Sequence, residues 1–203
     1  VAPAARTRFD TAGAAGHYAP DSGAPAHGGA RRETVTPAAP SIAEKIARAH
    51  ALMARHGPAL LADGEVRDLL ARYREEVART RDLMRRLGVV ALCARCAERT
   101  PGGTCCGEGI EDWYDEYLLL LNLLLETPIP EESALPGHCR FLGPAGCRLT
   151  ARHDFCVNYL CHRVPESLAP AAHARLQAQN GAELFLAWRL ERLVRERLGW
   201  RPG

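Results

Sequence analysis

The chain has 203 residues, of which 47% are hydrophobic, and this is enough for one domain with a sizeable core. Its 26 basic and 24 acidic residues leave a net charge of +2, which gives no electrostatic case for nucleic acid, because such binding needs clustered Lys and Arg. No stretch reaches the roughly 18–20 apolar residues that a membrane-spanning helix needs. We therefore expect neither a nucleic acid nor a membrane as a partner.

Residues 1–40 are rich in Ala, Gly and Pro and contain few bulky apolar side chains. Such a segment cannot bury enough surface to offset the entropy lost on ordering, so we predict a disordered tail. The same residues lack the apolar region of a secretory signal. We therefore expect a cytoplasmic protein whose cysteines are thiols or metal ligands, because disulfides are rare in reducing compartments.

A single helical domain is predicted over residues 41–203. Ser41-Ile42-Ala43-Glu44 has the S-x-x-E form of a capping box, which begins a helix, and Gly57-Pro58 is expected to end that helix. A second amphipathic helix is predicted from about Glu65 to Leu87. Gly88 is well placed as the first residue beyond it.

A third helix is predicted from Ile110 to Glu126, with Trp113 among the aromatic side chains that pack it, and Pro128 should stop it. The C-terminal pattern from Pro165 to Leu198 is helical again, and Asn180-Gly181 is the one place where it could break. Four of its side chains are expected to face inward: Leu184, Trp188, Val194 and Leu198.

Residues 127–165 are predicted to be irregular, since they hold five of the 14 prolines and four of the eight cysteines. An irregular segment of this length inside a domain is uncommon, and it becomes reasonable if metal bonds replace a hydrophobic core there. No strand alternation is convincing. The expected fold class is therefore all-α, a small helical domain with an irregular cysteine-rich metal-binding lobe.

All eight cysteines fall in two groups within one window of the chain. The first group is Cys93-x2-Cys96-x8-Cys105-Cys106, and the second is Cys139-x7-Cys147-x8-Cys156-x4-Cys161. Thiolates are soft ligands that select zinc, Cu(I) or iron–sulfur clusters, and a Cys-x2-Cys pair can hold one metal from a single tight turn. We expect the two groups to converge, so that metal binding and folding are linked.

The metal itself stays open between two main alternatives. Structural zinc takes four ligands, so eight cysteines could hold two zinc ions. They could equally hold one four-cysteine iron–sulfur cluster and leave four thiols for a second metal or for redox work. Because the adjacent side chains of Cys105 and Cys106 diverge, they suit a polynuclear centre better than one mononuclear site, which favours iron–sulfur over zinc.

Two further alternatives concern the ligands. His138, His153 and His162 flank the second cysteine group, and one of them could be a ligand, although the cysteines already supply enough donors. Disulfide bridges are the other alternative, with 105 possible pairings for eight cysteines.

The second cysteine group also carries a family resemblance. Cys139-Arg140-Phe141-Leu142, Gly146-Cys147-Arg148-Leu149, Arg152-His153-Asp154-Phe155-Cys156 and Tyr159-Leu160-Cys161 resemble the pattern C-x-F-L … G-C-x-[IL]-Y-x-x-R-P-x-x-C-x-x-[FY]-x-C. This is the pattern of the YkgJ-like proteins, which have a CxxCxxCC signature and are described as zinc- or iron-chelating domains.

The resemblance covers about residues 90–162 and departs from the family pattern in two ways. Eight residues rather than two separate Cys96 from Cys105, and His153 and Thr150 stand where the family usually has Pro and often has Tyr. The resemblance implies metal binding and little about biological role.

Three functions remain open on this basis. The first is a metal-binding protein with an iron–sulfur cluster or zinc and a metal-handling or redox role. The second is a zinc-stabilised helical interaction module, whose protein partner the sequence does not identify. The third is a cluster-dependent enzyme, for which we find no nucleophile–base pair, phosphate loop or cofactor fingerprint in the sequence.

Overall fold

The computed structural model describes residues 39–99 and 105–200, so the predicted tail over residues 1–40 lies outside the described residues except for its last two positions. The described chain is mostly helical, which confirms the all-α prediction. The elements in chain order are α1 (Ile42–Ala62), α2 (Gly64–Arg86), α3 (Val89–Arg99), the 3-10 helix η1 (Ile110–Trp113), α4 (Glu116–Leu124), β1 (Leu142–Gly143), β2 (Gly146–Cys147), α5 (Asp154–Asn158), α6 (Arg163–Ser167) and α7 (Pro170–Arg197).

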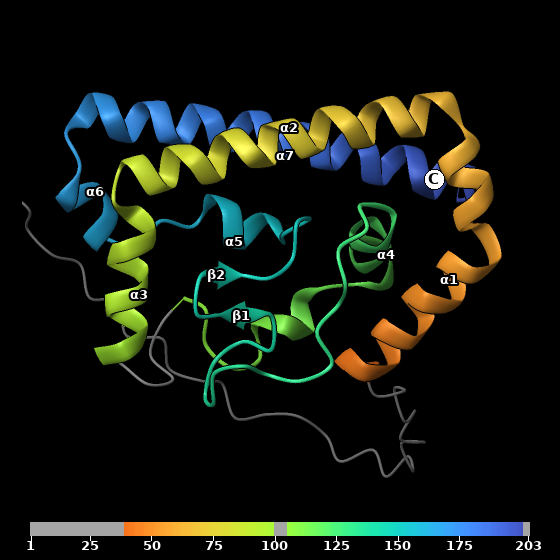
Figure 1. The fold of residues 1–203 in the computed structure, drawn as a ribbon, viewed down its shortest axis with the longest axis horizontal. Helices are drawn as coiled ribbons and strands as arrows, with labels where there is room; N and C mark the ends of the chain where they lie inside the picture. Colours follow the sequence, from red (N-terminus) through yellow and green to blue (C-terminus); the bar gives the residue numbers. More distant parts are fainter. Residues whose placement is uncertain (1–38, 100–104, 201–203) are drawn as a thin grey trace, which may run out of the picture. The chain divides into compact units, whose positions relative to one another are not determined.

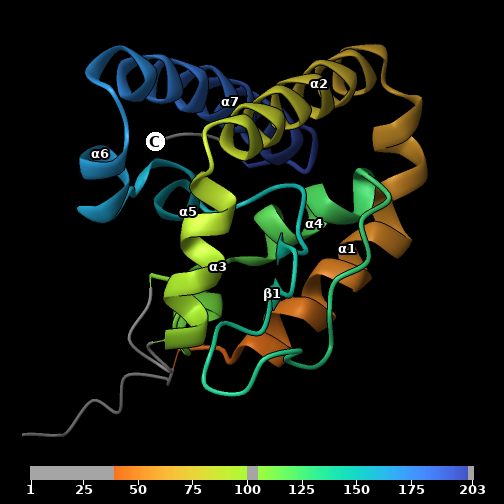
Figure 2. The same cartoon turned by 60° about the vertical axis from the view of Figure 1, so that its left-hand side comes forward.

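Two long helices form the frame of the domain. In both views α2 and α7 lie side by side, with α1 leading into one end of α2 and α3 leaving the other end (Figures 1 and 2). The small antiparallel hairpin β1–β2 lies between α1 and α3, within the irregular segment (Figure 1). No helix among residues 39–99 and 105–200 has both the length and the apolar character needed to cross a bilayer.

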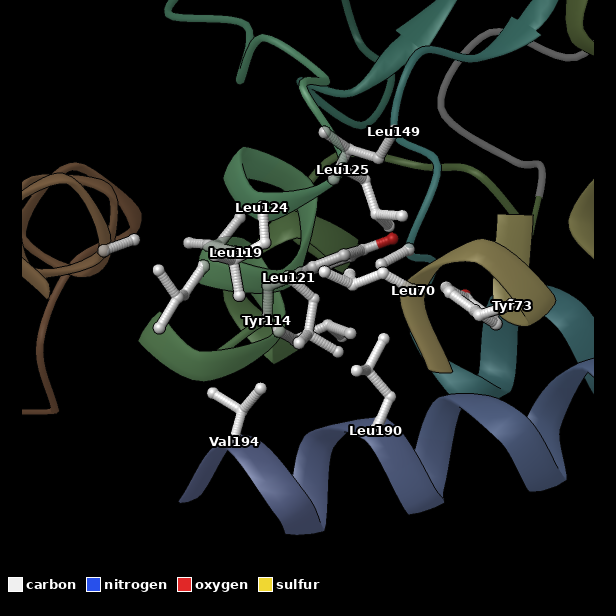
Figure 3. Close-up of a cluster of buried hydrophobic side chains, with 14 of the residues drawn as sticks. Leu70, Tyr73, Tyr114, Leu119, Leu121, Leu124, Leu125, Leu149, Leu190 and Val194 are labelled. Atoms are coloured by element: carbon white, nitrogen blue, oxygen red, sulfur yellow. The ribbon is translucent and has the colours of Figure 1, made fainter. Parts of the chain in front are cut away.

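The main hydrophobic core surrounds α4. Leu119 and Leu121 of this helix are fully buried, and Leu190 and Val194 of α7 point toward it from below (Figure 3). Leu70 and Tyr73 approach from α2, and Leu149 approaches from the irregular segment (Figure 3). Each such side chain contributes about 1.5–3 kcal/mol on burial. Helix α4 therefore packs with α1, α2 and α7 in one core.

The predicted capping box is present at the start of α1. The Ser41 backbone N–H donates to a Glu44 carboxylate oxygen at 2.7 Å, and the Ser41 hydroxyl accepts from the Glu44 N–H at 3.3 Å. The predicted end at Gly57-Pro58 is wrong, because α1 continues to Ala62. A proline inside a helix costs about 3 kcal/mol, and the burial of Leu60, two residues after Pro58, offsets this cost.

Helix α2 closely matches the helix predicted from Glu65 to Leu87, whereas the helix predicted from Ile110 to Glu126 does not form as one piece. Gly88 follows α2 with φ of 73°, as expected of a residue just past a helix. The region Ile110–Glu126 splits at Asp115, whose carboxylate accepts from two backbone N–H groups of α4 at 3.1 and 2.8 Å. Trp113 therefore lies on η1 instead of α4 and is 49% exposed, so its predicted packing is wrong.

Helix α7 runs without a break through Asn180-Gly181. Asn180 is buried and its side chain donates to the Val157 carbonyl at 2.8 Å, which ties α7 to α5. Of the side chains predicted to face inward, Val194 is fully buried, whereas Trp188 is 55% exposed and contradicts the prediction. The buried stripe is Leu176, Asn180, Glu183, Leu186, Leu190, Leu193 and Val194.

The segment 127–165 is irregular as predicted, apart from the β1–β2 hairpin and two short helices. Contrary to the sparse core expected there, Phe141 and Leu149 are fully buried in the main core. Asn122 of α4 adds polar anchors, since its side chain accepts from the N–H groups of Thr150 and Ala151 at 2.9 Å each and donates to the Ala151 carbonyl at 2.9 Å. The helical frame therefore holds the middle of this segment directly.

Candidate metal centre

The first cysteine pair lies on α3, a helix that the sequence analysis did not predict. Val89 starts this helix and is almost fully buried in a second, smaller hydrophobic cluster with Leu83, Val164 and Leu176. Residues three apart on a helix share one face, so Cys93 and Cys96 project from the same side of α3 rather than from the expected tight turn. Cys93 is exposed and Cys96 is half-buried.

The adjacent pair Cys105-Cys106 meets the start of the second cysteine group. The Cys139 backbone N–H donates to the Cys106 carbonyl at 2.9 Å, and Gly107 forms an antiparallel bridge with His138. Within the pair, a hydrogen bond between the two sulfurs lowers the pKa of Cys105 and raises that of Cys106. This contact places the end of the first group beside the beginning of the second.

Cys147 on β2 and Cys156 on α5 belong to the same neighbourhood as Cys106. The charges of both thiols raise the pKa of Cys106 further. Burial raises the pKa of the Cys156 thiol to about 11, and the charge of Cys147 adds to this shift. Burial likewise raises the pKa of Cys139 to about 12, with smaller contributions from the charges of Cys147 and Cys156. Since thiolates repel one another, ionisation of one of these thiols disfavours ionisation of the others.

Cys161 lies near the α3 pair. Cys93 as a whole residue is exposed, but partial desolvation of its thiol raises the pKa to about 11. The charges of three other thiols add to that shift, namely Cys105, Cys161 and Cys96. Arg163, two residues after Cys161, donates from its guanidinium to the Cys96 sulfur at 3.5 Å. The two cysteine groups of the sequence therefore adjoin each other in the fold.

The donor chemistry suits a soft metal, but the spacing does not close a coordination sphere. All eight cysteines are free thiols, and the structure contains no bridge among them. Among residues 39–99 and 105–200, no three or more Cys, His, Asp or Glu side chains are arranged to hold one ion. A metal that binds here would have to draw the sulfurs together, and its positive charge would remove the repulsion that raises their pKa values.

Several buried polar groups that the sequence analysis missed surround the thiols. The Tyr114 hydroxyl accepts from the His153 backbone N–H at 3.1 Å and also bonds to Cys156, which lowers the pKa of that thiol. Arg152 is buried, pairs with Glu183, and its charge also lowers the pKa of Cys156. Arg152 stands inside the quoted motif, but nothing in the sequence indicates a partner 31 residues away.

The three flanking histidines differ in how their rings are engaged. His153 caps α5, with its Nδ1 accepting from the Phe155 N–H at 3.2 Å, and His162 is exposed at the start of α6. His138 is buried, and because its Nδ1 lies 3.0 Å from the Pro136 carbonyl, that nitrogen carries the proton. Its Nε2 then has a free lone pair and no hydrogen-bond partner within the described part of the chain.

No family model, curated protein or solved structure matches this chain. The thiols and their surroundings therefore carry the functional argument.

Proposed function

We propose that the chain is a metal-binding cysteine-cluster protein, whose thiols hold an iron–sulfur cluster or zinc in a metal-handling or redox role. The observation that carries the proposal is the gathering of eight free thiols from α3, β2, α5 and the connecting segments, several with pKa values raised by burial and by one another. Deprotonation of several partly buried thiols that raise one another's pKa is costly without a cation, and soft metals are the cations that thiolates select.

The structure changes the balance between the two metals. The sequence favoured iron–sulfur because Cys105 and Cys106 could not easily share one mononuclear site. In the fold the two residues have different neighbours, since Cys105 acts on Cys93 whereas Cys106 responds to Cys147 and Cys156. The objection to two mononuclear zinc sites is therefore weaker, and zinc stands beside the iron–sulfur cluster in this proposal.

Anaerobic purification followed by iron, zinc and sulfide analysis tests the proposal. Brown protein that absorbs near about 400 nm and contains sulfide supports a cluster, and colourless protein with bound zinc supports zinc. Cys147→Ser/Cys156→Ser should reduce the metal content in either case. Protein that contains neither metal, and that takes up none when reduced and reconstituted, would contradict the proposal.

One observation favours the interaction module as a second candidate. Phe185, Trp188 and Trp200 are exposed at the C-terminal half of α7 and just beyond it, and the Arg192 guanidinium lies 5.7 Å above the Trp188 ring. Trp188, Arg192 and Trp200 line a groove of about 270 Å³. Exposed Trp and Arg are the residues that dominate binding energy at protein interfaces.

Two measurements distinguish the interaction module from the metal-binding function. A photoreactive phenylalanine analogue at the exposed position 185 should cross-link one defined protein, and Trp188→Ala should weaken binding of that protein while leaving metal content unchanged. If Trp188→Ala leaves binding of the cross-linked protein unaffected, then this face is not the interaction site.

A further inference from the structure

The exposed aromatic side chains of the fold lie in two patches. Among residues 39–99 and 105–200, six large hydrophobic side chains are exposed, and five of them are aromatic. We call one patch the acidic aromatic patch, and it consists of Asp112, Trp113, Asp154, Phe155 and Tyr159. The other is the basic aromatic patch, which consists of Phe185, Trp188, Arg189, Arg192 and Trp200. Contiguous exposed apolar area marks a protein-binding surface in soluble proteins.

The rings of the acidic aromatic patch connect η1 to α5. The Trp113 ring meets the Phe155 ring edge-on with their centres 4.8 Å apart. The Phe155 ring in turn stacks on the Tyr159 ring at 4.7 Å. Because Trp113 and Tyr159 are each about half exposed, the three rings form one apolar strip that reaches the surface at both ends.

Two exposed carboxylates border this strip. Asp112 and Asp154 each precede one of its rings in the chain. The Lys45 ammonium donates to the Asp112 backbone carbonyl at 2.5 Å, and the Asp154 carboxylate contacts the His153 ring at 2.7 Å. Within the described part of the chain, no Lys or Arg side chain pairs with either carboxylate. The patch therefore carries a negative balance of charge.

The basic aromatic patch lies on the C-terminal half of α7 and just beyond it. The Phe185 and Trp188 rings are stacked with their centres 6.2 Å apart. The Arg189 guanidinium lies 5.9 Å from the centre of the Phe185 ring, and among the described residues no carboxylate pairs with it. Arg192 pairs with the exposed Glu196 at 2.9 Å, a contact worth about 0–1 kcal/mol that a partner can replace. This patch therefore presents positive charge beside its rings.

One ion pair connects the two patches. Arg195 lines a groove together with Trp188 and Trp200. Its guanidinium donates to the Asp115 carboxylate at 2.5 Å, and Asp115 follows Trp113 by two residues. The patches therefore lie on either side of the Asp115–Arg195 contact, where one partner molecule can reach both.

We propose that this surface binds a second copy of the chain in a two-fold dimer, in which each acidic aromatic patch meets the basic aromatic patch of the other copy. A two-fold interface makes the same contact twice, so two patches of opposite charge on one chain are self-complementary. Complementary charge orients the two chains, and Trp, Tyr and Arg side chains supply most of the binding energy at such interfaces. The proposal rests on the second candidate function, whose partner it names, and is independent of bound metal.

The exposed aromatic area is sufficient for such a dimer. An aromatic side chain buries about 150–250 Å² in total, so one that is half exposed can still bury about 100 Å². The five exposed aromatic side chains of each chain would together bury about 1,000 Å² in the dimer, the lower limit for a specific interface. We therefore expect a weak dimer whose population depends on protein concentration.

Sedimentation equilibrium of the purified full-length chain tests the dimer, in reductant so that no disulfide forms between chains. With increasing concentration, the mass should rise from the 22.1 kDa of one chain toward twice that value and stop there. Asp112→Lys/Asp154→Lys and Arg189→Glu/Arg192→Glu each place like charges opposite each other. Each variant should therefore raise the dissociation constant at least about tenfold.

A mixture of the two charge-reversed variants is the decisive sample. Their reversed patches are complementary, so the mixture should recover a dimer that neither variant forms alone. The control Arg67→Glu/Arg72→Glu reverses two exposed arginines of α2, outside both patches, and should leave dimerisation unchanged. Asp112→Lys alone replaces the acidic-patch variant if lysine at position 154, the first residue of α5, prevents folding as judged by circular dichroism.

Cross-linking identifies the surfaces in contact. In the purified protein, a photoreactive phenylalanine analogue at position 185 should cross-link to residues 112–113 or 154–159 of the second chain. A mass of one chain at every concentration, or growth beyond two chains, would overturn the proposal, and so would a mixture of folded variants that stays monomeric. Metal content measured on the same samples should be equal in wild type and charge-reversed variants, so failure of the dimer and failure of metal binding are separate results.

Discussion

Arg152 and Glu183 form a buried ion pair, with the guanidinium Nη2 2.9 Å from one carboxylate oxygen and the two side chains only 8% and 0% exposed. The pair joins the start of α5 to the middle of α7. Burial of two charges is costly, and their mutual attraction compensates for it only while both partners are present. The pair is therefore a sensitive point of contact between the cysteine-rich segment and the helical frame.

Glu183→Gln should destabilise the domain strongly, because it leaves Arg152 charged, buried and without its counter-ion. We expect the free energy of unfolding to fall by about 3–5 kcal/mol, measured by urea denaturation. The matched control is Glu196→Gln, which breaks the exposed pair with Arg192 and should cost about 0–1 kcal/mol. Similar losses in both variants would show that burial does not distinguish the two pairs.

Arg152 should also favour metal binding through its positive charge. Arg152→Gln removes that charge, whereas Glu183→Gln leaves it without a competing carboxylate. We expect zinc affinity of the protein to fall about tenfold or more in the first variant and to rise in the second, since a charge at short range is worth more than about 1 kcal/mol. Chelator competition on folded protein measures both. A merely structural pair would lower affinity in both variants.

Asn122 is a second anchor of the cysteine-rich segment. Asn122→Ala would leave two buried N–H groups and one carbonyl near Ala151 without partners, at about 1–3 kcal/mol for each unsatisfied group. We therefore expect a loss of several kcal/mol in thermal or urea unfolding. Thr127→Val is the control, since it removes only the hydrogen bond to the Thr150 hydroxyl and should cost about 1 kcal/mol. Equal losses would show that Asn122 is not an anchor.

Protonation of Asp63 should lower the free energy of unfolding at acid pH. It caps α2 and pairs with Arg197, whose hydrogen bond holds the pKa of the carboxyl below its ordinary value of 3.8. A lowered pKa contributes stability above pH 3.8, and this contribution is lost as pH falls through the folded-state pKa. Asp63→Asn keeps a capping oxygen but cannot titrate, so its melting temperature should fall less steeply in that range. Parallel acid curves for the two proteins would contradict this.

Local signals predicted the start of α1 and the end of α2 well, and long-range packing explains the errors elsewhere. The capping box at Ser41 and the glycine at position 88 act within a few residues, so the sequence identifies them. In α7 the buried face includes Asn180 and Glu183, polar residues that a hydrophobic pattern assigns to solvent. This shifted the predicted stripe toward Trp188. The partners of both residues come from distant segments, so composition and spacing could not reveal them.

The candidate site was predictable in residue type but not in grouping. All eight cysteines lie in one window of the sequence, and the preference of thiolates for soft metals is enough to predict a metal site there. It could not indicate that Cys93 and Cys96 lie on a helix, because the anchor of that helix, Val89, packs against Val164 and Leu176 far along the chain. The neighbours of each thiol follow from such packing.

Metal removal should loosen the ends of the cysteine-rich segment and leave its middle intact. Phe141 and Leu149 are fully buried and Asn122 holds residues 150 and 151, so residues 139–152 should resist protease even in chelator. Residues 159–162, which follow the anchored helix α5, have few such anchors, as Tyr159 is half exposed and Cys161 is only partly buried. Structural metal sites supply apparent binding energies of about 10 kcal/mol, enough to hold such a segment.

Limited proteolysis with and without chelator, mapped by mass spectrometry, should therefore give new cuts at residues 159–162, while helical circular dichroism largely survives. Cys156→Ser should give the same cuts without chelator, and Ser167→Ala, which leaves all eight thiols in place, should not. Identical cleavage with and without metal, at an unchanged melting temperature, would mean that the thiols do not use a metal to stabilise this segment. In that case any bound metal would have to act in chemistry or transfer rather than in folding.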